Sequence, residues 1–332
     1  MVRAVVIEQF GEPKDVLTAA DRPLPEPGPG EVRIALDLAP IHNHDLAIIR
    51  GVYGYRPPLP AIPGTEGVGR IDAVGAGVTD RTVGQRVAVS GATAVWAEYF
   101  VAQAAQALPV PDSVDDETAA QLLAMPFSAA VLLDDLRVTA GDWLVINAAN
   151  GAVGRLVNLL ARRRGVHVLN LVRGQASVRA LRELGYEPVV DTEADDWLAQ
   201  AAAATSGAPI VRAVDQVGGP AGADLLELLA PNGELVSFGA LSGKPWTLSP
   251  GTLIFKQAVV KGFWGAKRAQ EIGAAERTRV LRELVELAAS GELRLAIEAV
   301  HPLDDAAEAA AATERPGRKA KIALSPAPDR TR

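Results

Sequence analysis

The hydrophobic pattern of the chain changes character near Asp112. Before that point, short apolar or alternating stretches are separated by turns rich in Gly and Pro, which is typical of antiparallel strands. The strands that this pattern predicts are Val2–Ile7, Glu31–Leu38, Val68–Val74 and Arg86–Val89. We therefore expect an antiparallel, partly open β domain at the start of the chain.

Beyond Asp112, apolar strands alternate with helices, which is the pattern of a parallel sheet with crossover helices. The predicted strands are Trp143–Asn147, Val166–Val172, Pro188–Val190, Ile210–Asp215, Glu234–Gly239 and Val259–Phe263. The predicted helices between them are Gly151–Arg164, Ser177–Leu184, Asp195–Ala204 and Ala221–Leu229. Six such strands complete a doubly wound sheet, so the expected fold class is α/β.

The end of the chain is expected to return to the first domain. The pattern there predicts two helices and a strand, at Glu271–Ser290, Ala306–Thr313 and Lys319–Leu324, before a frayed tail from Pro326. We expect residues 1–118 and 267–332 to form the β domain and residues 119–266 to form the doubly wound domain.

The amino-acid composition excludes several classes of function. The formal net charge of −7 does not suit binding to a nucleic-acid backbone. The chain has no cysteine, which excludes disulfides, thiolate chemistry and cysteine-ligated zinc. No apolar run approaches the ~20 residues of a membrane span. The N-terminal sequence has no signal-peptide pattern, so we expect a cytoplasmic protein that binds a small molecule.

A glycine turn predicts a dinucleotide site after the first strand of the sheet. The strand 143–147 leads into Ala149-Asn150-Gly151-Ala152-Val153-Gly154, and a helix follows at once. Gly151 would allow close approach of a pyrophosphate, Gly154 would allow the helix to pack on the strand, and the helix N-terminus would face the phosphates. An ordinary turn between a strand and a helix is the alternative, because a lone glycine triplet is a weak signal.

Arg173 follows the second strand of the sheet, at the position that distinguishes NAD from NADP. An acidic residue there would bind the ribose 2′-hydroxyl, whereas a guanidinium suits a 2′-phosphate. The sequence therefore favours NADPH, with a surface arginine that binds no ligand as the alternative.

Several motifs together resemble the medium-chain dehydrogenase/reductase superfamily over nearly the whole chain. Those common to the superfamily are Pro25 to Val32, Gly64 to Gly69, Val83 to Val87, Trp96 to Tyr99 and Gly233 to Val236. Others resemble the branch of 2-enoyl thioester reductases: His42 to Asp45, Gly51 to Gly54, Asn147 to Asn150, Leu171 to Arg173 and Gly262 to Trp264. The resemblance implies a GroES-like, partly open β-barrel domain joined to a Rossmann domain, and it implies a homodimer.

The resemblance also implies a metal-free enzyme. Zinc-dependent members carry a Cys near His42 and a His at the position of Thr65, and this chain has neither. We therefore expect no metal, although His42, His44, Asp45 and Glu66 leave a metal site conceivable.

The resemblance assigns the reactive groups of the expected reductase. Tyr53 matches the tyrosine that donates a hydrogen bond or proton to the substrate, and Ser128 matches a residue that contacts the nicotinamide amide. His42 and His44 replace Asn and Ser of the branch, so His42 is a second candidate acid and His44 a candidate pocket residue.

Tyr55 and Trp264 are further candidates for the substrate pocket. The alternative for Tyr53 and Trp264 is a purely structural role, in which the ring packs against neighbouring side chains.

Three functions remain open at this point. The first is NADPH-dependent reduction of an activated C=C bond in a 2-enoyl thioester or related enone. The second is an NADPH quinone reductase of the same superfamily, and the third is a dinucleotide-binding protein without catalysis. The stretch Phe255–Phe263 is expected to be a strand near the sheet edge, where pairing with a second subunit would cover exposed backbone groups.

Overall fold

The computed structural model describes residues 1–315 and 317–326, and most of the tail expected from Pro326 lies outside them. The chain divides into two compact units, Met1–Ala124 with Leu281–Arg332, and Met125–Val280. These divisions differ from the expected ones at 118 and 266. The reason lies in α10 (Gly265–Glu271), since its Arg268 pairs at 2.7 Å with Asp135 of α4 (Ala124–Leu136) and so belongs to the second unit.

The second unit contains the six-stranded parallel sheet that the sequence predicts. Its strands are β8 (Trp143–Ile146), β9 (His167–Val172), β10 (Val189–Asp191), β11 (Ile210–Asp215), β12 (Glu234–Ser237) and β13 (Val259–Gly262). They lie in the order β10-β9-β8-β11-β12-β13, and every pairing is parallel. This is the doubly wound order, with its reversal between β8 and β11, where such folds bind ligands.

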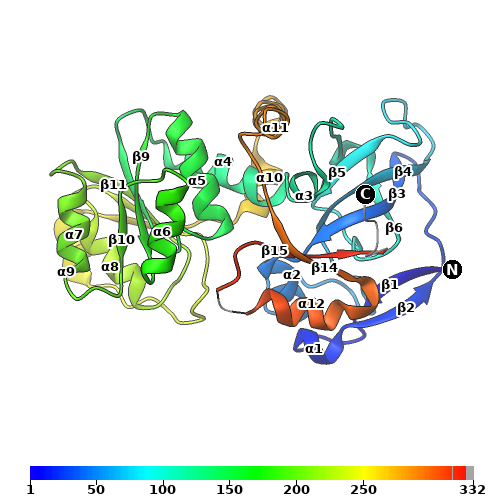
Figure 1. Cartoon of the computed structure of the whole chain (residues 1–332), viewed down its shortest axis with the longest axis horizontal. Coiled ribbons are helices and arrows are strands. Elements are labelled where there is room, and N and C mark those ends of the chain that lie inside the picture. Colours follow the sequence, from blue (N-terminus) through cyan, green and yellow to red (C-terminus); the bar gives the residue numbers. More distant parts are fainter. Residues whose placement is uncertain (316, 327–332) are drawn as a thin grey trace. The chain divides into compact units, whose positions relative to one another are not determined.

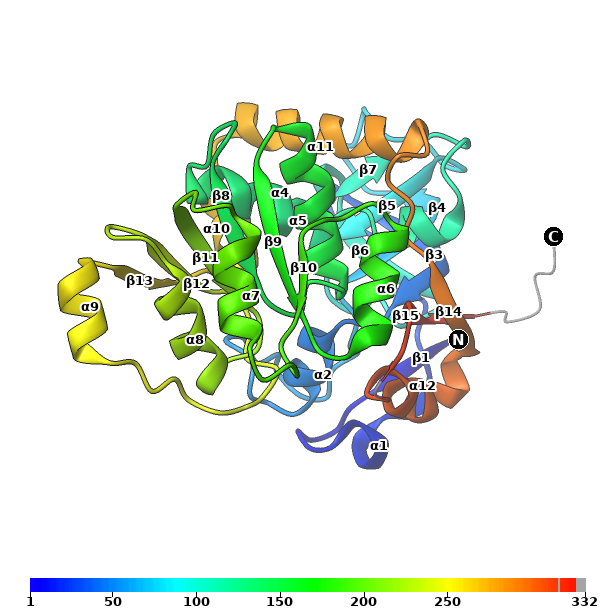
Figure 2. The same cartoon turned by 60° about the vertical axis from the view of Figure 1, so that its left-hand side comes forward.

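Helices connect these strands (Figure 2). They are α5 (Ala152–Arg163), α6 (Gln175–Glu183), α7 (Trp197–Ala204), α8 (Pro220–Leu228) and α9 (Pro250–Lys256). Because parallel crossovers are right-handed, α5 and α6 cover one face and α7 and α8 the other. Ala201 of α7 and Leu225 of α8 accordingly share one buried cluster with Val145 and Leu169 of the sheet.

The expectation of a strand over Phe255–Phe263 is wrong at its start. Phe255 and Lys256 end the helix α9, Gln257 closes it in the left-handed region with φ +48, and the strand begins only at Val259. Ser249 caps this helix by accepting from Thr252 N–H, and Pro250 occupies its first turn. The cap and the proline thus favour a helix here, although the residues that follow have a preference for strands.

The first unit contains a mostly antiparallel sheet. Its strands are β3 (Glu31–Pro40), β4 (Glu66–Val74), β5 (Arg86–Ser90), β6 (Tyr99–Gln103), β7 (Ala107–Pro109), β14 (Ile297–Pro302) and β15 (Lys321–Ser325). Their order is β14-β15-β3-β4-β5-β7, with β6 paired to β3. The C-terminal strand β15 pairs with β3, as the expected discontinuous domain requires.

Shorter elements complete the first unit. They are the hairpin β1 (Val2–Val6) and β2 (Thr18–Arg22), the helices α1 (Pro13–Val16), α2 (Asn43–Ile49), α3 (Asp116–Ala120) and α12 (Ala306–Thr313), and the 3-10 turns 104–106 and 303–305. In Figure 1, α12 lies beside α1 and β15, so segments far apart in the sequence pack together. The remaining helix, α11 (Ala274–Ala289), contains the second division between the units.

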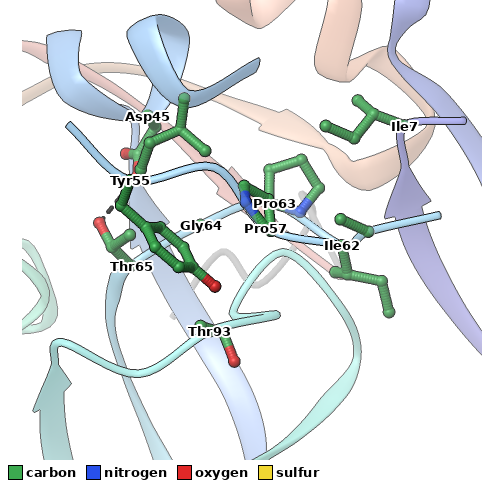
Figure 3. Close-up of a pocket in the computed structure, with 11 residues that line it drawn as sticks. Ile7, Asp45, Tyr55, Pro57, Ile62, Pro63, Gly64, Thr65 and Thr93 are labelled. Atoms are coloured by element: carbon green, nitrogen blue, oxygen red, sulfur yellow. Dashed lines mark hydrogen bonds between the residues drawn. The ribbon is translucent and has the colours of Figure 1, made fainter. Parts of the chain in front are cut away.

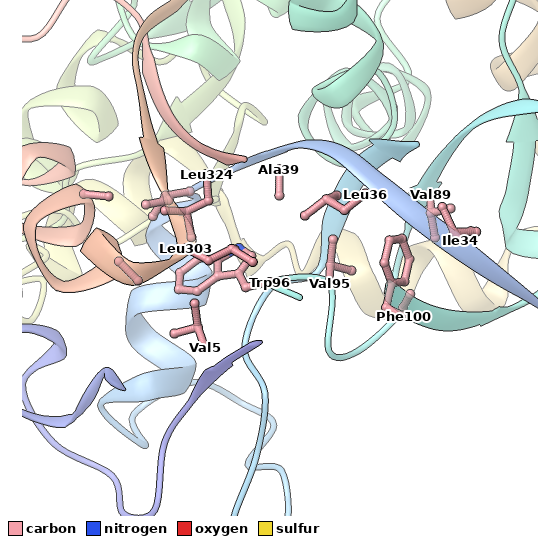
Figure 4. Packing of buried hydrophobic residues seen from close by; sticks show 14 of the residues in the cluster. Val5, Ile34, Leu36, Ala39, Val89, Val95, Trp96, Phe100, Leu303 and Leu324 are labelled. Atoms are coloured by element: carbon pink, nitrogen blue, oxygen red, sulfur yellow. The ribbon is translucent and has the colours of Figure 1, made fainter. Parts of the chain in front are cut away.

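The core of the first unit is centred on Trp96. Its indole is completely buried and packs among Val5 from the N-terminal hairpin and Leu303 and Leu324 from the C-terminal segment (Figure 4). Burying apolar surface from such distant segments stabilises the fold by roughly 25 cal/mol per Å². The same ring also shapes the segment that carries the candidate site.

Candidate functional site

Helix α2 positions a cluster of polar side chains in the first unit. His42 immediately precedes the helix, and its backbone N–H donates to Asp45 Oδ2 at 2.9 Å. This bond caps the first turn of the helix and holds the Asp45 carboxylate inside the unit, where the side chain is buried. The other oxygen of Asp45 remains available for a second contact.

Gly64 brings Thr65 and Glu66 to the same place. Its φ of +92 lies in the left-handed region, and a Cβ there would lie 2.2 Å from Cδ1 of the Trp96 indole. Only glycine therefore fits against the core ring. The chain then enters β4 with Thr65 and Glu66 directed at α2.

His42 and Glu66 form a buried pair. His42 Nε2 lies 2.6 Å from Glu66 Oε2, and the side chains are 1% and 0% exposed. Burial lowers the pKa of His42 well below its usual value and raises the pKa of Glu66 to about 7. Near neutral pH His42 is therefore uncharged and enclosed by protein, whereas the Glu66 carboxyl group is about half ionised.

The second carboxylate oxygen of Glu66 binds the backbone at the end of the segment Met1–Ala124. Glu66 Oε1 accepts from the backbone N–H groups of Leu123 and Ala124 at 2.7 and 2.6 Å. These two bonds fix the residues at which the chain leaves the first unit. Nothing in the local sequence around Glu66 signals this role.

Lys321 places an amine near the same cluster. It lies on β15, beside the point where Ile41 N–H donates to the Ile322 carbonyl. Burial lowers the pKa of Lys321 to about 8, and attraction to Glu66 and Asp45 acts in the opposite direction. Lys321 has no recognisable signal in the sequence, because only the pairing of β15 with β3 brings it to this site.

His44 takes part in a chain of hydrogen bonds. His44 Nε2 lies 2.8 Å from Thr65 Oγ1, and the Thr65 hydroxyl donates to Asp45 Oδ1 at 2.7 Å. The His44 ring stacks on that of His42 with 4.8 Å between centroids, yet its side chain is 21% exposed. His44 is thus ordered on one edge and accessible on the other.

Tyr53 lies next to His44 in the folded chain. The two rings are 5.9 Å apart, and Tyr53 is half-buried. Its segment turns back after α2, with the Val52 and Tyr53 N–H groups both donating to the Ala47 carbonyl. The structure therefore brings Tyr53, His44 and the buried His42 together.

Tyr55 lines a small apolar pocket beside this cluster (Figure 3). The pocket has a volume of about 30 Å³, and Asp45 and Thr65 supply its polar wall. Its other lining residues are Ile7, Ile48, Pro57, Ala61, Ile62, Pro63, Gly64 and Thr93. Figure 3 shows the Tyr55 hydroxyl directed toward Thr93.

The four potential metal ligands near α2 are committed to other contacts. His42 is bound to Glu66, and His44 reaches Asp45 through Thr65. Within residues 1–315 and 317–326, no group of three His, Asp or Glu side chains is arranged to hold a metal ion. No helix in those ranges is both long and apolar enough to cross a membrane.

The glycine turn of the second unit lies between β8 and α5. Gly151 precedes α5 as its N-cap, and a Cβ at Gly154 would lie 2.3 Å from the Ala149 carbonyl oxygen. Gly154 therefore permits the helix to pack directly on the turn. Asn150 Oδ1 accepts from Arg155, while Ala152 and Val153 begin the helix and leave N–H groups free of intrahelical partners.

Two aspartates support this edge of the sheet and were not identified from the sequence. Asp215, at the end of β11, accepts from Asn147 Nδ2 and Trp246 Nε1, both at 2.5 Å, and from the backbone of Gly218. Asp191, at the end of β10, accepts from Gly174 N–H at 2.8 Å, and its backbone hydrogen bonds lower its pKa. The local sequence signal for this role is an acidic residue at the end of a buried strand.

The other two predicted cofactor contacts, Arg173 and Ser128, lie at different elements of the second unit. Arg173 is exposed directly after β9 and has no hydrogen bond or ion pair within the described part of the chain. Ser128 of α4 lies near Trp264, because a Cβ at the next residue, Gly265, would lie 2.5 Å from Ser128 Oγ. The Trp264 side chain is partly exposed.

Two known family models match separate parts of the chain. Residues 28–112 match the alcohol dehydrogenase GroES-like domain, and residues 152–317 match the domain described as zinc-binding dehydrogenase. The GroES-like fold expected for the first unit is thereby confirmed.

Known proteins match almost the entire chain. The mitochondrial enoyl-[acyl-carrier-protein] reductase of Rattus norvegicus is 30% identical over 95% of this chain and 86% of its own length. The quinone oxidoreductase structure from Pseudomonas syringae superposes with a TM-score of 0.88 at 28% identity, over 98% and 100% of the two chains. A mycobacterial protein solved with NADPH superposes with a TM-score of 0.86 at 29% identity, over 98% and 100%.

Proposed function

Because the chain belongs to the medium-chain dehydrogenase/reductase superfamily, in its enoyl reductase-like branch, we propose that it reduces an activated C=C bond with NADPH. The substrate class is a 2-enoyl thioester or a related enone. Bound NADPH would supply the hydride, which is chemistry of the cofactor itself. The protein would bind the dinucleotide, orient the acceptor and stabilise the enolate.

The fit of the second unit supports NADPH as the cofactor. The close packing of Gly154 on Ala149 leaves a cradle at the α5 N-terminus, where backbone N–H groups suit a pyrophosphate. We propose that Asn150, Gly151, Ala152 and Val153 form this cradle. Ser128 would contact the nicotinamide amide.

Arg173→Ala is expected to raise the Michaelis constant for NADPH about 10- to 100-fold and to change that for NADH little. Arg173 would lose a charge-assisted contact of ~1.5–3 kcal/mol to the 2′-phosphate. Steady-state kinetics with both cofactors measure the ratio. Arg179→Ala, an exposed arginine on α6, is the matched control. Equal losses for NADPH and NADH would contradict this role.

The observation that carries the proposed reaction is Tyr53 beside His44, with ring centroids 5.9 Å apart. A phenolic hydroxyl there would donate to the carbonyl oxygen of the acceptor, where negative charge develops after hydride addition. Tyr55 and the small apolar pocket would contact the remainder of the substrate, and Trp264 is a further pocket candidate. His42 is enclosed, so we propose that it positions His44 instead of contacting substrate.

An acceptor panel tests the proposal. NADPH oxidation is followed with crotonyl thioester, with a 1,4-quinone and with no acceptor. We expect the thioester to give the highest kcat/KM. The quinone oxidoreductase relatives favour the second candidate, a quinone reductase, which would instead prefer the quinone. A protein that binds NADPH but oxidises it with neither acceptor would be a binding protein without catalysis.

Exhaustive chelation is expected to leave activity unchanged, and the purified protein is expected to contain less than stoichiometric zinc. The reason is that His42 and His44 are held by Glu66 and Thr65 in hydrogen bonds that compete with metal coordination. Elemental analysis beside the activity assay measures both quantities. Activity that falls on chelation and returns with Zn²⁺ would refute metal independence.

We expect a homodimer formed through the β13 edge. β13 ends the sheet order, and the exposed fractions of Ile254 and Phe255 beside it are 67% and 85%. Pairing two copies would cover this edge and its apolar side chains. Phe255→Asp should yield monomers in light scattering at micromolar concentration, whereas Leu184→Asp, at the exposed residue that follows α6, should not. A monomeric wild type would exclude this dimer. The cytoplasmic location stays a prediction.

A further inference from the structure

We propose that His44 is the acid that protonates the α-carbon of the substrate, through its Nδ1 atom. The inference deepens the proposed reduction and rests on it. It starts from the hydrogen-bond chain His44 Nε2 to Thr65 Oγ1, 2.8 Å, and Thr65 Oγ1 to Asp45 Oδ1, 2.7 Å. Tyr53 has a separate role at the carbonyl oxygen.

The hydrogen-bond chain determines which nitrogen of His44 carries a proton. The Asp45 carboxylate only accepts, so the Thr65 hydroxyl gives its single hydrogen to Asp45 and accepts from His44 Nε2–H. Nδ1 is then an acceptor in the neutral ring and a second donor in the imidazolium. It has no hydrogen-bond partner within residues 1–315 and 317–326 and is not among their buried unpartnered atoms.

The surroundings of His44 leave its ring accessible, whereas those of His42 do not. Asp45 Oδ1 lies 3.7 Å from His44 Nε2, so a carboxyl group lies close to the His44 ring. His42, by contrast, is enclosed and already engaged by Glu66. The two rings stack at an interplanar angle of 10°, so the buried ring supports the orientation of the accessible one. The 21% exposure of His44 allows its proton to be replaced from solvent.

The step balances in atoms and charge. When bound, NADPH would supply the hydride that forms a C–H bond at the β-carbon, and the C=C π electrons would move toward the carbonyl to give an enolate. The His44 Nδ1–H bond then breaks as a C–H bond forms at the α-carbon. The enolate becomes the saturated thioester, and His44 becomes the neutral Nε2–H tautomer. A solvent proton restores the imidazolium.

Labelling in D₂O tests the donor directly. Wild type should convert crotonyl thioester and NADPH to butyryl thioester with one deuterium at the α-carbon, in one configuration, as read by NMR. His44→Gln has no exchangeable acid and should give both configurations, with turnover lower by about 100-fold. Tyr53→Phe is the matched control and should remain stereospecific. A stereospecific His44→Gln enzyme would overturn the proposal.

A second readout needs neither cofactor nor substrate. ¹⁵N NMR of the free protein should show neutral His44 as the Nε2–H tautomer in wild type. In Thr65→Val, which lacks the hydroxyl, the tautomers should become mixed, whereas Thr65→Ser should retain the wild-type spectrum. An Nδ1–H tautomer in wild type would contradict the proposed direction of the hydrogen-bond chain from His44 through Thr65 to Asp45.

The two levels of failure are distinguishable. A wild type that reduces only quinones removes both the proposed substrate class and the donor role. A wild type that reduces the thioester, beside a His44→Gln variant that keeps one configuration, removes the donor role alone.

Discussion

Tyr53→Phe is expected to lower the turnover number for an enoyl thioester by about 100-fold, because one donor to the developing enolate is lost. The ring and its packing beside His44 are preserved in this variant. The affinity for NADPH should hardly change, since the proposed dinucleotide cradle belongs to the other unit. Stopped-flow turnover and NADPH fluorescence titration measure the two quantities.

Tyr55→Phe is the matched control for this variant. Tyr55 lines the apolar pocket and is more exposed, so the loss of its hydroxyl should have a much smaller effect on turnover. Wild-type turnover in Tyr53→Phe would exclude the tyrosine as the donor. In that case His44, which shares its surroundings, would have to stabilise the enolate oxygen as well.

Glu66→Gln is expected to gain stability relative to wild type as the pH rises. The pKa of Glu66 is raised from 4.5 to about 7 in the folded protein, so the folded state binds a proton more tightly than the unfolded state. Wild type therefore loses free energy of unfolding between about pH 4.5 and 7, by roughly 3 kcal/mol at 1.36 kcal/mol per pKa unit. Gln does not titrate, and its carbonyl can still accept from Leu123 and Ala124.

Urea unfolding at pH 5 and pH 8 measures this change. His42 opposes the trend, because its lowered pKa makes stability fall as the pH drops below its usual value near 6.5, but it is present in both proteins. Glu183→Gln, at an exposed carboxylate, should show no comparable pH dependence. A Glu66→Gln difference that is the same at both pH values would show that Glu66 ionises normally.

Local sequence patterns determined the strands of the second unit and the four helices α5, α6, α7 and α8. The strand 210–215 of the second unit and the helix 306–313 of the first unit have the predicted bounds, and the second unit contains the six predicted parallel strands. Such elements depend on short-range apolar periodicity and on glycine at positions where a side chain would collide, as at Gly154. These determinants lie within a few residues of one another, so they can be read without the fold.

Sequence signals were weaker where neighbouring preferences conflicted. Phe255 and Lys256 have strand-like neighbours, but the Ser249 cap and Pro250 start a helix that includes them. The sequence did bring Tyr53, His42 and His44 forward as candidates. His42 was the second candidate acid and His44 only a candidate pocket residue, because nothing in a run of residues shows which side of a helix start faces the core.

Tertiary structure alone decided the environments of these groups. Strand pairing places Glu66 against His42 and brings Lys321 of β15 near them, and the resulting burial raises the pKa of Glu66 and lowers those of the other two. The accessible edge of His44, held by Thr65 and Asp45, arises in the same way. Residue types along the chain thus determined which chemistry is available. Burial and pairing between distant segments determined which side chain is in a position to use it, because solvation and charge depend on all neighbours in space.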